Sequence, residues 1–367
     1  MYTPIMKNRT QEMKVLKDFQ YCFDESIVPL IEIITDKYEK RYKTDPKTGR
    51  YLMEKPDGNR RRQKIALPKT EEDIITLSEI SGILQEKKAF IDFFRFTDEE
   101  YKGVNYDVSK VELSFTLSRD NKLYHKRMLE LGQFPNLIPT ISIKDEFEPS
   151  LRNLTNFIDE LRKQNGSIAI RITDDLLERY SGLLTNQLTD QDFIMLDIRQ
   201  QNFEAMFMEL QEFKQLQCHA RKIVLNSPRL RELYNGEYEN LVFTQKINNI
   251  CATKFNSYKF DGFGDFAGYK DTLPSSTGGG TGSALALIYC KAKNQFFSVV
   301  NKNSSLGMKG YNSVVDDLLN NRATIDPNFD CPILTKINSE ANKKKYGNWG
   351  TWNYYSIGRY IHQQATK

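Results

Sequence analysis

The sequence predicts an α/β fold: a (β/α) TIM-barrel-like domain with a C-terminal β-hairpin and helical extension. Short apolar runs, typical of strands buried on both faces, recur along the chain. Amphipathic segments with helical spacing separate these runs, and strands that alternate with helices favour a parallel sheet. No glycine-rich turn follows the first run, which disfavours the alternative, a doubly wound open sheet. Seven or eight consecutive units therefore indicate a barrel.

The expected elements follow in chain order. Seven runs are predicted to be barrel strands: 27–34, 89–96, 137–144, 167–173, 193–199, 222–227 and 258–268. An eighth strand is expected at 284–292, in a hairpin with 296–302. Helices are expected at 151–164, 203–216 and 310–322, and the tail 341–364 is expected to dock on the body because its apolar residues have helical spacing. These elements predict a barrel domain over 1–270, with a basic insertion at 36–69. The rest, 271–367, is predicted to be a linker, a β-hairpin and C-terminal helices packed on the barrel.

Composition excludes several classes of protein. The five cysteines include no CxxC pair and the three histidines are scattered, which argues against a disulfide framework and a zinc site. Motifs of nucleophilic or metallopeptidase catalysis, GxSxG and HExxH, are missing. The glycine-rich stretch GGGTGS at 278–283 lacks the ending of a phosphate-binding loop, and a linker is expected there. With no signal-peptide core and no apolar run near roughly 18 residues, we expect a cytoplasmic protein without a membrane span.

Charged residues interrupt the predicted strands, although burying an unpaired charge is costly. Because side chains alternate between the two faces of a strand, these residues fall on one face near each strand's C-terminal end. That face is expected to line the barrel interior at the rim where barrel active sites lie. The predicted catalytic residues are Glu32, Asp92, Arg171, Asp197, Arg199 and Asp265, and Lys144 and Asn226 are predicted to bind a ligand.

Such a mixture of carboxylates and cations allows more than one interpretation. It can hold a phosphate-bearing ligand, with the carboxylates acting as general acids or bases if the protein is an enzyme. It can also neutralise itself as a salt-bridge network. If carboxylates instead ligate a metal, Mg²⁺ is the expected cofactor. The sequence leaves these alternatives open, together with the question of whether the protein is an enzyme.

The basic insertion at 36–69 supports a different function. It contains Arg60, Arg61 and Arg62 in succession, and tyrosines lie among its cations. A loop of this kind either is simply solvated or binds phosphates and stacks on bases. The alternative hypothesis is thus a non-catalytic module that binds nucleic acid or a partner protein. In a third hypothesis, the chain is a subunit whose partner, encoded nearby, holds the chemistry.

Three stretches resemble a known family. The chain opens with YTPIMKNRTQEMKVLKDF and IVPLIEI, contains FGDFAGY at 263–269, and closes with GNWGTW and SIGRYI. Together they resemble the phage-type Beta protein family, over nearly the whole chain. The resemblance implies the barrel architecture and a role in phage–host conflict, either as antiviral defence or as a phage-encoded protein. It implies no established reaction.

Overall fold

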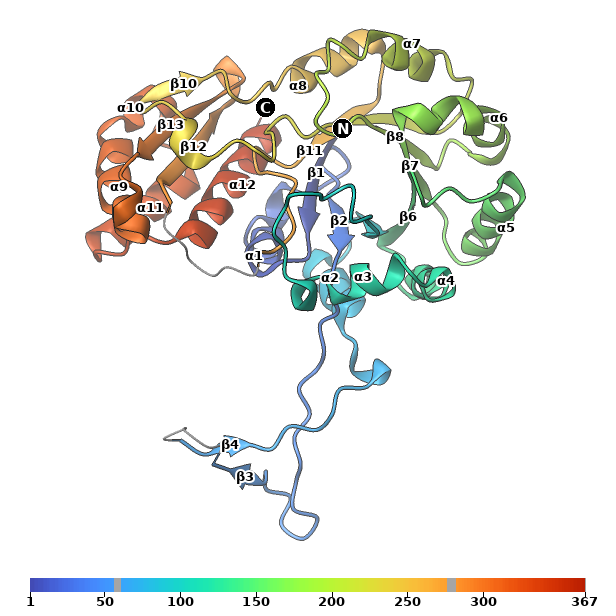
Figure 1. Cartoon of the computed structure of the whole chain (residues 1–367), viewed down its shortest axis with the longest axis horizontal. Coiled ribbons are helices and arrows are strands. Elements are labelled where there is room, and N and C mark those ends of the chain that lie inside the picture. Colours follow the sequence, from blue (N-terminus) through green and yellow to red (C-terminus); the bar gives the residue numbers. More distant parts are fainter. Residues whose placement is uncertain (56–60, 276–281, 367) are drawn as a thin grey trace.

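A computed structural model describes residues 1–55, 61–275 and 282–366. Within these ranges, eight parallel strands form a closed barrel in the order β1-β11-β9-β8-β7-β6-β5-β2, which confirms the predicted barrel (Figure 1). The barrel strands are β1 (Tyr2–Lys7), β2 (Leu30–Ile33), β5 (Ala89–Phe93), β6 (Leu137–Ile143), β7 (Ala169–Thr173), β8 (Phe193–Asp197), β9 (Arg221–Leu225) and β11 (Gly262–Asp265).

The eighth barrel strand is β1, so the prediction that 284–292 supplies it was wrong. Strand β1 pairs in parallel with β2 on one side and with β11 on the other, and thereby closes the barrel. Its sequence YTPIMK is short and contains a proline, which ordinarily argues against a strand inside a sheet. Segment 284–292 cannot take this place because it pairs antiparallel with the strand that follows it, as the predicted hairpin requires.

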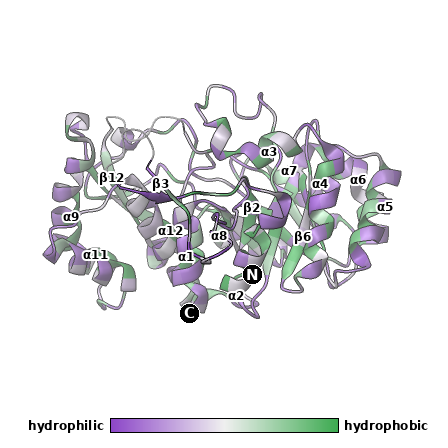
Figure 2. Ribbon diagram, turned by 90° about the horizontal axis from the view of Figure 1, so that it is seen from below, coloured by the Kyte–Doolittle hydropathy of each residue, from purple (hydrophilic) through white to green (hydrophobic). Residues whose placement is uncertain are grey.

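Helices surround the barrel and present their polar faces outward (Figure 2). In α5, the residues Leu154, Phe157, Ile158 and Leu161 are buried at helical spacing, and Ser150 caps the first turn. The predicted helices at 151–164 and 203–216 are confirmed. The helices of this part are α1 (Thr10–Asp18), α2 (Thr76–Leu84), α3 (Glu112–Leu117), α4 (Asn121–Leu129), α5 (Leu151–Arg162), α6 (Leu177–Gln187), α7 (Phe207–Gln215) and α8 (Cys251–Lys254).

Beside the barrel lies a three-stranded sheet in the order β10-β13-β12, which is covered by helices (Figure 1). Its strands are β10 (Val242–Thr244), β12 (Ala284–Cys290) and β13 (Gln295–Asn301), and the helices are α9 (Tyr311–Asn320), α10 (Arg322–Ile325), α11 (Pro332–Asn342) and α12 (Trp349–Ala365). Strand β10 comes from the connection between β9 and β11, and so precedes the predicted domain boundary at residue 270. That boundary stays a prediction.

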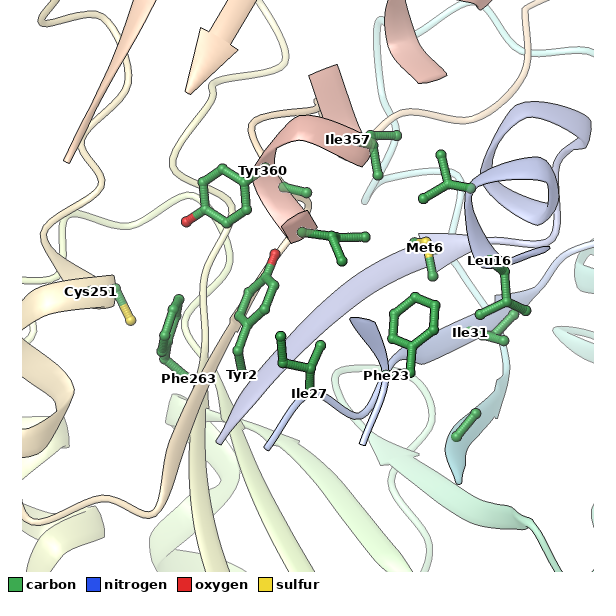
Figure 3. Close-up of a cluster of buried hydrophobic side chains, with 14 of the residues drawn as sticks. Tyr2, Met6, Leu16, Phe23, Ile27, Ile31, Cys251, Phe263, Ile357 and Tyr360 are labelled. Atoms are coloured by element: carbon green, nitrogen blue, oxygen red, sulfur yellow. The ribbon is translucent and has the colours of Figure 1, made fainter. Parts of the chain in front are cut away.

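Helix α12 joins the barrel to this sheet. Its buried residues include Trp352, Ile357 and Tyr360, as expected for a docked tail. Figure 3 shows Tyr360 beside Tyr2 of β1, with Ile357 toward α1. The two tyrosine rings lie 5.6 Å apart between centroids. One apolar cluster runs from the outer face of the barrel through α12 to β12 and β13, so the two parts share a core.

The described residues of the insertion, 36–55 and 61–69, form an arm that extends away from the barrel (Figure 1). Near its tip, β3 (Met53–Glu54) pairs with β4 (Gln63–Lys64). At its base, the Ile75 N–H donates to the carbonyl of Lys37 at 2.8 Å, and Arg41 pairs with Asp73 at 2.6 Å. None of the helices in the described ranges has the length and apolar character needed to cross a membrane.

Candidate functional site

The interior of the barrel has an apolar floor. Its side chains alternate with those that face the helices, as strand geometry requires. The floor consists of Ile5, Val28, Leu30, Phe90, Ile138, Ala169, Phe193, Met195, Ile223, Leu225 and Phe266. Polar side chains begin one step further along the strands, toward their C-terminal ends, where the barrel opens.

Arg171 lies at the centre of the polar layer. Its guanidinium donates to Glu32 at 2.7 Å, to Asp92 at 2.9 Å and to Asp197 at 2.8 Å. These carboxylates come from three other barrel strands, and Glu32 and Asp92 have no exposed surface. The structure therefore brings together four of the predicted site residues. Their catalytic role stays a prediction.

Lys7 belongs to the same layer, and the sequence interpretation missed it. Its ammonium lies 2.6 Å from Glu32 and 2.8 Å from Asp271. Because Ile5 faces the interior, Lys7, two residues further on, faces it as well. Applying the alternation of side chains to YTPIMK, the sequence of β1, would have found Lys7.

A second layer of ions covers the first. Lys144 pairs with Glu100 at 2.8 Å, and Arg199 pairs with the same carboxylate. Arg231 pairs with Asp271 at 2.5 Å and also donates to the backbone carbonyl of Glu100 at 2.7 Å. Glu100, Arg231 and Asp271 lie on loops. Side-chain alternation applies only to strands, so it could not predict that these three residues reach the cluster.

Arg199 reaches the cluster from outside its strand. Strand β8 ends at Asp197, and Arg199 has a left-handed backbone with φ 47°. Its N–H donates to the Asp197 carboxylate at 3.0 Å, which holds this turn over the mouth. A turn, and not strand alternation, therefore brings Arg199 beside Asp197.

Among the described residues, the cluster matches five cations with five carboxylates. The cations are Lys7, Lys144, Arg171, Arg199 and Arg231; the carboxylates are Glu32, Asp92, Glu100, Asp197 and Asp271. The cavity that remains beside Lys144, Arg171 and Arg199 measures about 10 Å³, room for no more than one water molecule. In this conformation the mouth is closed by a network that neutralises itself.

Burial and pairing act in opposite directions on the pKa values here. Burial lowers the pKa of Lys144 to about 8, against the attraction of Glu100. Burial also raises the pKa of Asp92, which Arg171 opposes. For Asp271, burial favours the neutral form, but Lys7, Arg231 and Arg199 together hold its pKa well below the ordinary value.

Asp265 and Asn226 do not join the cluster, so their predicted inward orientation was wrong. In β9, Ile223 and Leu225 face the interior, whereas Val224 packs in the outer core. Because β9 has apolar residues on both faces, its sequence does not indicate which face points into the barrel. The Asn226 carboxamide oxygen instead accepts the Ser227 N–H at 2.7 Å.

In β11 the inward positions are glycines, which carry no side chain to reveal the face. A Cβ on Gly264 would lie 2.6 Å from the Leu225 side chain. Asp265 consequently points outward, where it accepts hydrogen bonds from Tyr2 at 2.8 Å and Tyr360 at 2.7 Å. Burial raises the pKa of this carboxyl, although both tyrosines stabilise its charged form.

The residues of the polar layer do not fit Mg²⁺. A magnesium ion needs open carboxylate oxygens around it, but the Arg171 guanidinium lies among Glu32, Asp92 and Asp197 and binds all three. In the described ranges, no group of three or more metal-binding side chains gathers elsewhere.

The arm holds the remaining predicted ligand-binding residues. Arg61 and Arg62 are exposed beside β4, away from the barrel mouth, and Arg60 lies outside the described residues. The Lys64 ammonium lies 3.6 Å from the ring centroid of Tyr51, which is 50% exposed. Residues 276–281, which hold most of the predicted glycine linker, also lie outside the described residues.

The chain was compared with curated proteins and with models of protein families. A search of curated proteins found no match. A family model, described as Beta protein, matches residues 2–227, a range that runs from β1 through β9 and includes the arm and most of the ion cluster. Because the match covers more than half of the chain, this protein belongs to the Beta protein family.

Proposed function

We propose that this Beta family protein binds nucleic acid through its arm. The observation that carries the proposal is the separation of charge. Residues 36–69 contain seven lysines and five arginines against five acidic residues, an excess of seven positive charges. The whole chain has a net charge of +4, so the remainder is slightly acidic. A basic segment that extends into solvent from a weakly acidic body favours a polyanionic partner.

The form of the arm favours nucleic acid over other polyanions. A two-stranded ribbon has the dimensions that the major groove of a duplex admits, and the exposed ring of Tyr51 offers a surface on which an unpaired base stacks. Tyr42 and Tyr51 pack edge to face with centroids 5.7 Å apart, and Lys64 lies over both rings. Rings and cations thus occur together on one exposed surface.

The test replaces three arm cations, Arg61, Arg62 and Lys64, by glutamine. Binding to labelled single- and double-stranded oligonucleotides is measured by fluorescence anisotropy across a salt titration. Since each phosphate contact contributes roughly 0.7–0.9 to the salt slope, the triple variant should lower the slope by about 2–3.

The matched control replaces Lys343, Lys344 and Lys345, which form an equally exposed cationic run after α11. This variant should bind like the wild type. If both variants lose the same amount of affinity, binding depends only on the overall positive charge of the protein, and the proposal is overturned. If the wild type binds no nucleic acid at low salt, a protein partner for the arm becomes the better explanation.

Family membership and the resemblance support a wider proposal, a cytoplasmic role in phage–host conflict. All five cysteines are free, which suits a reducing compartment. Plaque counts on bacteria that express the wild type or the triple arm variant test this role. Equal plaque numbers with the wild type and with an empty vector, across a phage panel, would argue against antiviral defence.

A second proposal concerns the rim of the barrel, where the sequence predicts a phosphate-bearing ligand. The contact that favours it is the pairing of one loop carboxylate, Glu100, with two cations of the rim, Lys144 and Arg199.

A further inference from the structure

One carboxylate of the ion cluster at the barrel mouth, that of Glu100, comes from a loop and not from a barrel strand. Glu100 lies on the loop between β5 and α3, and its two carboxylate oxygens divide between Lys144 and Arg199. Without Glu100, the described residues supply four carboxylates for the five cations of the cluster. The mouth would then carry an uncompensated positive charge, which is costly at low exposure.

Glu100 is also close to the solvent. The side chains of Glu32 and Asp92, deep in the barrel, have no exposed surface, whereas that of Glu100 is 15% exposed. Its cationic partner Arg199 is 22% exposed. An anion that arrives from solution therefore meets Glu100 and Arg199 before the deeper ions.

One polar group at this place has no partner. The hydroxyl of Thr173, at the end of β7, is buried without a hydrogen bond in the described part of the chain. It lines the same small cavity as Lys144 and Arg199. The hydrogen bonds that the Glu100 carboxylate accepts come from Lys144 and Arg199, and none of them comes from the Thr173 hydroxyl.

We propose that the barrel mouth is a phosphate site and that Glu100 occupies it as a built-in substitute for the ligand. A phosphate group offers three oxygens, enough for Lys144, Arg199 and the Thr173 hydroxyl together. It displaces the Glu100 carboxylate, which turns outward into solvent. This inference rests on the second proposal above, that the rim binds a phosphate-bearing ligand. It adds that the Glu100 carboxylate closes the site when no ligand is bound.

The loop itself stays in place during this exchange. Arg231 holds the backbone carbonyl of Glu100, and the neighbouring Tyr101 is 1% exposed within an aromatic cluster. The Tyr101 hydroxyl donates to Asp271 at 3.0 Å. Only the Glu100 side chain has to rotate, and because it is partly exposed it can rotate into solvent.

The experiment compares Glu100→Gln with Glu99→Gln. Glutamine keeps the shape of residue 100 and removes the competing charge, and Glu99 is a neighbour whose side chain is 73% exposed. Pyrophosphate binding is measured by isothermal titration calorimetry at constant ionic strength, with citrate as a carboxylate probe. Glu100→Gln should bind pyrophosphate at least tenfold more tightly than the wild type and Glu99→Gln. Citrate, which carries carboxylates and no phosphate, should gain less.

A further variant tests the composition of the site. Adding Thr173→Val to Glu100→Gln keeps the volume of the side chain and removes the hydroxyl, so most of the gain should disappear. Circular dichroism checks that each variant is folded. If Glu100→Gln does not fold alone, added pyrophosphate should restore folding, and failure to do so would overturn the inference.

The outcomes separate this inference from the proposals on which it builds. If the folded wild type and Glu100→Gln both fail to bind pyrophosphate, the rim proposal and this inference fail together. If the wild type binds and Glu100→Gln binds no better, the rim binds phosphate but Glu100 is not its substitute. The triple arm variant should bind pyrophosphate at the rim unchanged, because its substitutions lie outside the cluster.

Discussion

Arg171 illustrates how a single residue organises the barrel interior. Its side chain is 5% exposed, and its guanidinium binds three carboxylates from three strands. Buried ion pairs add little net stability when complete, but removing one partner leaves charges that are buried and uncompensated. At this scale the sequence was informative: alternation along the strands predicted that Glu32, Asp92, Arg171 and Asp197 share the interior, and they do.

Replacing Arg171 by methionine should therefore destabilise the protein by about 3–5 kcal/mol, because three carboxylates lose their common partner. Urea denaturation measures this change. Arg179→Met is the control, since Arg179 pairs with Glu148 at the surface, and it should cost less than about 1 kcal/mol. A stable Arg171→Met variant that has lost phosphate binding would instead assign this residue directly to the ligand.

At the scale of the element, β11 shows why one strand was misread. Alternation identifies the inner face only if both faces carry side chains, and β11 has Gly262 and Gly264 on the inner one. Asp265 is the polar side chain of this strand. It was assigned to the rim, but it faces the core that the barrel shares with α12. The glycines are required there because neighbouring strands approach closely.

Gly264→Ala should destabilise the protein by about 1–3 kcal/mol, since the new methyl group would lie 2.6 Å from both the Thr3 carbonyl oxygen and Leu225. Gly182→Ala provides the contrast. Gly182 is exposed in α6 with open space around it, and alanine there should stabilise by about 0.5–1 kcal/mol. Thermal and urea unfolding measure both. Changes of the same sign would contradict this account of β11.

At the scale of the whole molecule, α12 joins the barrel to the three-stranded sheet. The Tyr360 hydroxyl donates to Asp265 of β11 and accepts from Asn249, which in turn donates to Asn294 after the first strand of the hairpin. This polar network lies inside the apolar cluster that spans both parts. The two parts are therefore expected to unfold together.

Tyr360→Phe should lower the free energy of unfolding by about 1.5–3 kcal/mol, because a buried carboxylate loses a hydrogen-bond donor. The control is Tyr355→Phe in the same helix, whose hydroxyl has no hydrogen-bond partner in the described ranges, and it should change stability by less than about 0.5 kcal/mol. Chemical denaturation followed by fluorescence and by circular dichroism compares the variants. Equal effects would mean that the Asp265 contact adds nothing to the junction.

The sequence by itself determined the repeating strands and helices, the hairpin and the docked tail. It also determined five members of the ion cluster that face the interior by strand alternation: Glu32, Asp92, Lys144, Arg171 and Asp197. Each depends on a local period, either two residues along a strand or 3.6 along a helix. The tertiary structure alone decided which strand closes the barrel, which way β9 and β11 face, and that loop residues Glu100, Arg231 and Asp271 complete the charge balance. These features depend on contacts between residues far apart in the chain, and a local sequence period carries no information about such contacts.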